Sequence, residues 1–111
     1  MAGKFEIYKD KAGEFRFRLK ASNGEIVLSS EGYKAKTGAS NGVASVQKNC
    51  TDEKCFTKNT TASGKFRFNI RAKNNQVIGT SQSYDSEAAR DNGIQAIARA
   101  AAGAKVADLT E

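Results

Sequence analysis

The chain has 111 residues, of which 18 are Lys or Arg and 12 are Asp or Glu, so its formal charge is +6 at pH 7. It contains no His, which excludes serine–histidine and cysteine–histidine catalysis and His-ligated zinc within one chain. No apolar run approaches the roughly 18 residues that span a bilayer, and the N-terminal residues lack the apolar stretch of a signal peptide. These features predict a small cytoplasmic domain without a membrane partner.

The most informative feature of the sequence is an internal repeat with a constant offset of 51 residues. The segment GEFRFRLKA at 13–21 aligns with GKFRFNIRA at 64–72, and the same offset pairs Tyr33 with Tyr84. The offset holds without a gap over most of each copy, which chance does not produce. Two copies are too few for a solenoid, so we expect a pseudo-symmetric pair of equivalent units.

Each copy begins with two short strands joined by a turn that contains Gly. In the first copy we expect these strands at 5–8 and 15–20. The second of them, FRFRLK, alternates apolar and basic side chains, which predicts one buried face and one solvent-exposed face. The second copy repeats the arrangement with strands at 55–58 and 66–71.

A hairpin signal then leads to a third strand in each copy. Asn23-Gly24 suits a type I′ turn, in which both central residues adopt positive φ. The equivalent Asn74-Asn75 also tolerates the left-handed region. Third strands are expected at 25–30 and 76–82.

Beyond the two tyrosines the apolar spacing changes from a strand period to a helical one. The apolar face of the predicted helices consists of Ala39, Val43, Val46 and Cys50 in the first copy and Ile94, Ile97 and Ala101 in the second. Asp85 or Ser86 suits the N-cap of the second helix, and Gly103 suits its end. Gly42 and Gly93 lie inside these helices, where Gly is unfavourable, so we expect close packing there.

Each copy is therefore a β-β-β-α unit, and the predicted fold class is α+β: an antiparallel sheet packed on helices, with pseudo-twofold symmetry. We expect repeat one at 1–51 and repeat two at 52–103 to form one compact domain. A flexible tail is expected at 104–111. The protein is expected to be a monomer built like a dimer.

The repeated motif resembles that of the YegP-like family of small bacterial proteins. Phe15–Ala21 and Phe66–Ala72 carry it, each followed by Asn, a third strand, Tyr and then Gly with Val or Ile. The second copy departs from the pattern at Asn75, where Gly is expected. The resemblance implies a tandem β-β-β-α fold that is similar to a dimer fused into one chain. It implies no enzyme activity, and it assigns no functional residues.

The first candidate site is the exposed face of the second strand of each copy, where a polyanion would meet Arg16, Arg18, Lys20, Arg67 and Arg71. If the helices cover the Phe side, these cations line an open sheet that can contact phosphates. Base stacking would need a tyrosine on the same face. The alternative is that the charges solvate the face and discourage aggregation.

Two residue pairs complete the candidates. Tyr33 and Tyr84 lie where strand gives way to helix, and they are either packing residues or a ligand-binding seam between the copies. Cys50 and Cys55 are close enough in sequence for a disulfide or a redox pair, and ordinary reduced thiols are the third interpretation. The sequence leaves these alternatives open.

No motif in the sequence indicates a catalytic residue, a metal site or a cofactor site. The leading hypothesis is a non-enzymatic binding or interaction module with a protein partner. The alternative is nucleic-acid binding through the basic strand face.

Overall fold

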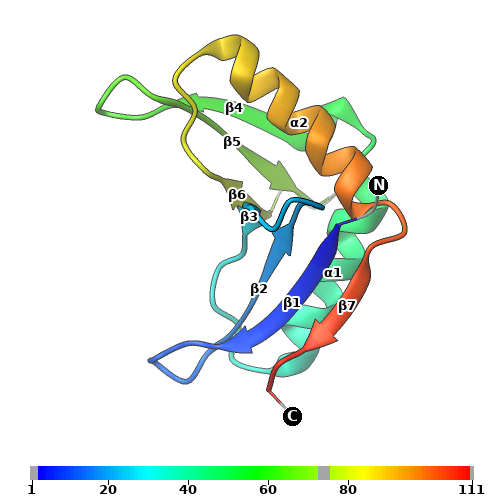
Figure 1. The fold of residues 1–111 in the computed structure, drawn as a ribbon. Helices are drawn as coiled ribbons and strands as arrows, with labels where there is room; N and C mark the ends of the chain where they lie inside the picture. Colours follow the sequence, from blue (N-terminus) through cyan, green and yellow to red (C-terminus); the bar gives the residue numbers. More distant parts are fainter. Residues whose placement is uncertain (1–2, 73–75, 111) are drawn as a thin grey trace.

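The computed structural model describes residues 3–72 and 76–110 (Figure 1). Within them the elements are, in chain order, β1 (Lys4–Lys9), β2 (Phe15–Lys20), β3 (Ile26–Ser29), α1 (Lys36–Asn49), a 3-10 turn (Glu53–Cys55), β4 (Phe56–Thr60), β5 (Phe66–Arg71), β6 (Val77–Ser81), α2 (Glu87–Ala101) and β7 (Lys105–Asp108). The strands form one sheet in the order β4-β5-β6-β3-β2-β1-β7. The predicted α+β class and the tandem β-β-β-α order are confirmed.

The hairpins are closed by three-residue loops that end in a left-handed Gly. The Asp10 amide donates to the Glu14 carbonyl at 2.9 Å, and the Gly13 amide donates to the Asp10 carbonyl at 3.0 Å. The second copy repeats the pattern, and Gly13 and Gly64 share a φ of 83°. A residue with a Cβ would be strained at either position.

The predicted type I′ turn at Asn23-Gly24 is wrong. The Ala21 amide donates to the Glu25 carbonyl and the Gly24 amide to the Ala21 carbonyl, both at 2.9 Å, so this loop also has three residues. Because the strands close at Ala21 and Glu25, only the last loop residue needs positive φ, and Gly24 has φ 85°. The equivalent prediction at Asn74-Asn75 lies outside the described residues.

The second helix begins and ends at the predicted residues. The Ser86 hydroxyl caps α2 by accepting from the Ala89 amide at 3.1 Å. Gly103, with φ 71°, follows the end of that helix. Helix α1 begins after Ala35, which makes no side-chain cap.

The two copies share one hydrophobic core. Phe17 and Leu19 of β2 and their counterparts Phe68 and Ile70 of β5 are completely buried, as the alternation predicts. Helices α1 and α2 each contact strands of both copies on this face. The opposite face of the sheet carries the basic side chains of β2 and β5.

A pseudo-twofold axis passes between β3 and β6, where the two half-sheets join. Ser29 pairs with Thr80, which is its own counterpart under the repeat offset. Leu28 and its counterpart Gly79 lie beside this axis. A Cβ at Gly79 would lie 2.9 Å from Cγ of Leu28, so this part of the core has room for one large side chain only.

We therefore expect Gly79→Ala to lower the free energy of unfolding by about 1–3 kcal/mol through overpacking. In a Leu28→Ala background the same change should cost nothing, because the space is empty. Urea unfolding of the two single variants and the double variant measures this coupling. An equal cost of Gly79→Ala in both backgrounds would show that the glycine is required for another reason.

Strand β7 corrects the prediction of a flexible tail over 104–111. Lys105–Asp108 pair in parallel with β1, and the Leu109 amide donates to the Ile7 carbonyl at 2.8 Å. The Asp108 carboxylate forms an ion pair with Lys36 Nζ at 2.7 Å. Both partners are distant in sequence, so no local pattern marks this segment as a strand. Strands β7 and β4 form opposite edges of the sheet (Figure 1).

The pKa of Asp108 reports the docking of β7. Hydrogen bonds from Lys36 and Thr110 lower it from the ordinary 3.8 to about 2. Because the pKa of the docked carboxyl is lowered, its ionised form stabilises the docked strand fully at pH values above the ordinary pKa of 3.8. This stabilisation is lost as the pH falls through about 2. Lys36→Met should move the pKa of Asp108 up toward 3.8, measured by NMR pH titration. Lys34→Met is the matched control and should leave it unchanged.

Candidate functional site

In the first copy, two carboxylates partly offset the charge of the predicted basic residues. Arg18 Nε lies 2.7 Å from Glu6 Oε1, and Lys20 Nζ lies 3.2 Å from the same oxygen. The hydrogen bond from Arg18 holds the pKa of the buried Glu6 below its ordinary value, against the opposing effect of burial. Arg16 Nε lies 2.6 Å from Asp10 Oδ2. Lys4 also reaches Glu6, at 3.5 Å, so two carboxylates meet four cations and the positive charge of this face is reduced rather than cancelled.

The aromatic ring on this face is also occupied. The Arg18 guanidinium lies over the Tyr8 ring, 4.7 Å from its centroid. This cation–π contact covers the ring on which a nucleic-acid base would stack.

In the second copy, hydroxyl side chains replace both carboxylates. Thr57 stands at the position of Glu6, and Arg71 Nε donates to its Oγ1 at 2.8 Å. Arg67 donates to the Ser83 hydroxyl at 3.2 Å. The predicted basic residues thus share one face of the sheet but lie in two different electrostatic environments.

The two tyrosines pack in the same way, each stacked on the Phe of its own copy, Tyr33 on Phe17 and Tyr84 on Phe68, but they differ in the hollow beside them. Tyr33 lines a hollow of about 280 Å³ between α1 and β6, together with polar residues that include Glu31, Asn41 and Gln76. Burial, followed by the Glu31 charge, raises the pKa of Tyr33. Tyr84 does not line this hollow, and its ring stacks on Phe68 with the centroids 6.3 Å apart. The structure therefore does not bring both tyrosines to one seam.

Each tyrosine also accounts for a glycine inside a helix. A Cβ at Gly42 would lie 3.0 Å from the Tyr33 hydroxyl, and a Cβ at Gly93 would overlap the Tyr84 hydroxyl. The close packing expected of these glycines is thus against Tyr84 at Gly93, and against both Tyr33 and Phe17 at Gly42, where Phe17 Cε2 would lie 2.6 Å from an added Cβ.

Cys50 and Cys55 are buried, and no disulfide joins them. The Cys50 thiol donates to the Gln47 carbonyl at 3.4 Å, and burial raises the pKa of this thiol. A raised pKa lowers the thiolate fraction, which is opposite to what a redox or nucleophilic cysteine needs. The structure thus favours the interpretation of Cys50 as an ordinary reduced thiol.

Sequence reasoning missed the free edge of β4. Strand β4 pairs with β5 on one side, and no other described strand covers its second side. Its counterpart β1 has β7 in that place. The Thr61 amide donates to the Lys65 carbonyl where the hairpin closes. Along an antiparallel strand, successive residues direct their N–H and C=O groups alternately toward the partner strand and away from it. The backbone groups of Phe56 and Lys58 therefore point away from β5, toward the outer edge. These groups form an open hydrogen-bonding edge.

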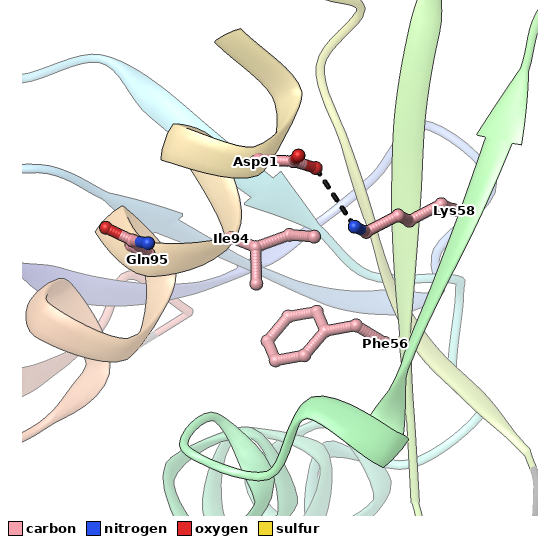
Figure 2. A pocket seen from close by; sticks show the side chains of 5 residues that line it. All are labelled: Phe56, Lys58, Asp91, Ile94 and Gln95. Carbon is pink, nitrogen blue, oxygen red and sulfur yellow. Dashed lines mark ion pairs between the residues drawn. The ribbon is translucent and has the colours of Figure 1, made fainter. Parts of the chain in front are cut away.

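A hollow of about 360 Å³ lies beside this edge, between β4 and α2. Figure 2 shows its lining side chains, Phe56, Lys58, Asp91, Ile94 and Gln95. Lys58 Nζ lies 3.1 Å from Asp91 Oδ1, and this contact lowers the pKa of the carboxyl. The hollow combines an apolar floor with one ion pair at its rim.

The first copy has no equivalent opening at these positions. Phe5, Ile7 and Val43, the counterparts of Phe56, Lys58 and Ile94, are each at most 3% exposed. The repeat alignment contains the signal for this difference, because Lys58 replaces Ile7 and Asp91 replaces Ser40.

Two further properties concern the described residues as a whole. None of their helices is long and apolar enough to cross a bilayer. The described residues also contain no group of three or more His, Cys, Asp or Glu side chains that could hold a metal ion.

Comparison with known proteins places the chain in a family. A family model for a domain of unknown function, DUF1508, matches residues 10–56 and 62–108. The chain is 56% identical over 109 residues to the "UPF0339 protein in ptx operon 5′ region" of Stutzerimonas stutzeri, with 98% of each chain covered. It is 47% identical over 97 residues to UPF0339 protein YegP of Escherichia coli, with 87% of this chain and 88% of the relative covered.

The fold is similar to that of a solved relative. The solution NMR structure of yegP from E. coli matches with a TM-score of 0.93 at 44% identity, covering 98% of this chain and 94% of that one. The YegP-like resemblance is thus confirmed along the whole repeat. With two tandem matches to one domain model, the chain belongs to the DUF1508 family, in the two-copy form of its UPF0339 relatives.

Proposed function

We propose that the protein is a non-enzymatic interaction module that binds an extended segment of a partner protein as an added strand along β4. The observation that carries this proposal is the contrast between the two edges of the sheet. Strand β7 covers β1, whereas the equivalent edge of β4 is open among the described residues and has a hollow beside it. In strand addition, backbone hydrogen bonds supply affinity and side-chain pockets supply specificity.

The docking of β7 supports an orientation for the bound segment. Because β7 runs parallel to β1, the pseudo-twofold relation favours a segment parallel to β4. Its backbone would bond the outward groups of Phe56 and Lys58. One of its side chains would enter the hollow, where Phe56 and Ile94 offer apolar contact.

A phage-displayed library of random dodecapeptides tests the proposal. Lys58→Pro removes one of the outward N–H groups of β4. An edge strand tolerates Pro at a position whose N–H does not bond the neighbouring strand. Lys58→Ala is the matched control, since it loses the same side chain and keeps the N–H. Peptides enriched on the wild-type protein should bind Lys58→Pro at least about tenfold more weakly, and should bind Lys58→Ala within about threefold of wild type.

The site of binding is read from NMR shifts. Enriched peptides should move the amides of residues 56–60. Peptides that bind Lys58→Pro and wild type equally would place binding elsewhere. A library that yields no binder would also contradict the proposal.

A second candidate function is polyanion binding by the open face of the second copy. The contact of Arg67 with the Ser83 hydroxyl favours it, because the counterpart Arg16 is paired with the Asp10 carboxylate. Twelve-nucleotide single- and double-stranded DNA and RNA should then shift the amides of residues 65–71 at about 50 mM salt, and the shifts should revert at about 200 mM. Residues 14–20, whose cations are paired with Glu6 and Asp10, should respond less. Absent shifts at low salt would exclude this function.

A further inference from the structure

The contacts of β7 indicate how this fold recognises an edge strand. Val106 pairs with Phe5 and Asp108 pairs with Ile7, so alternation directs both side chains toward the helix-covered face. Asp108 then meets Lys36, the first residue of α1, at 2.7 Å. The docked strand thus places an apolar residue, which stays 49% exposed, two positions before a charged residue that is matched at the start of the helix.

At the β4 edge the apolar part of this arrangement is kept and the charge is reversed. Phe56 and Ile94 stand at the positions of Phe5 and Val43. Glu87, the first residue of α2, stands at the position of Lys36 and is exposed. An acidic strand residue would therefore be repelled by Glu87 where Asp108 is attracted by Lys36. Lys58 stands at the position of Ile7 beside it, and its charge is offset by Asp91 at 3.1 Å.

Several charged groups of β4, α2 and the neighbouring loops already have partners. Lys58 forms its ion pair with Asp91, and Lys65 forms one with Asp85. The Arg90 guanidinium lies 5.5 Å from the centroid of the Phe66 ring and is largely buried. Glu87 is thus the charge that the pseudo-twofold relation places opposite an incoming strand residue.

We infer that the β4 edge selects a strand with an apolar residue followed, two positions later, by Lys or Arg. This inference rests on the proposed function and names the chemistry of its partner segment. Since the chain's own C-terminal strand carries Val106 and Asp108, it has the wrong charge for this edge. This repulsion would keep the C-terminal strand of one molecule from docking on the β4 edge of another. Such head-to-tail docking does not close into a ring, and it would therefore build fibres.

Two labelled peptides test the inference by fluorescence anisotropy. The first has the sequence of residues 103–111, GAKVADLTE, and the second carries Asp108→Lys within the same sequence. Wild-type protein should bind the basic peptide about five- to tenfold more tightly, because repulsion is replaced by attraction at one exposed pair. The difference should shrink at high salt.

Charge reversal in the protein provides the matched comparison. Glu87→Lys should invert the preference, so that the native-sequence peptide binds more tightly. Glu87→Gln should bind the two peptides nearly equally. Lys58→Pro should weaken both peptides, because it removes one of the outward N–H groups that a docked strand uses.

The outcomes separate the two proposals. If both peptides shift the amides of residues 56–60 with equal affinity, or if Glu87→Lys does not invert the preference, the charge selection is wrong and strand addition stands. If neither peptide shifts those amides at millimolar concentration, strand addition along β4 is itself contradicted.

Discussion

The antiparallel pairing of β3 with β6 is the interaction on which the rest of the structure depends. It joins two three-stranded halves into a single sheet, and the pairing of Ser29 with its own counterpart Thr80 makes the relation a pseudo-twofold. Once the halves share a sheet, both helices pack on one face and contact strands of both copies. Neither helix then needs to bury its apolar face against its own copy alone. At the axis, Gly79 leaves the space that Leu28 fills, so the copies cannot be identical there.

The joining of the two halves also makes the two outer edges of the sheet different. A closed pair of equivalent units has two outer edges, and the C-terminal segment can cover only one of them. Strand β7 covers β1 and leaves β4, where the side chains have diverged to Lys58, Asp91 and Glu87. An inward-facing lysine on an edge strand discourages indiscriminate pairing. Such an edge is suited to a selected strand rather than to any strand.

The net charge of +6 is a poor guide to function in this protein. In the first copy Glu6 lies beneath Arg18 and Lys20, and Asp10 pairs with Arg16. The alternating pattern identified the exposed face correctly, but the pairing of charges across neighbouring strands depends on register. Glu6 is separated from Arg18 by a hairpin, and no spacing rule along one strand connects them.

Local physics made most of the fold predictable from the sequence. Period-two alternation marks β2 and β5 because successive side chains point to opposite faces. Helical spacing marks α1 and α2, and Ser86 caps α2 through a bond to a residue three positions later. The tertiary structure alone decided the features whose partners are distant in sequence. The conformation of the loop at Asn23-Gly24 is set by the residues at which β2 and β3 stop pairing. Strand β7 forms because it can pair with the edge of β1 and form an ion pair with Lys36. The free edge of β4 likewise exists only once the strand order is known, because an edge is a property of the whole sheet.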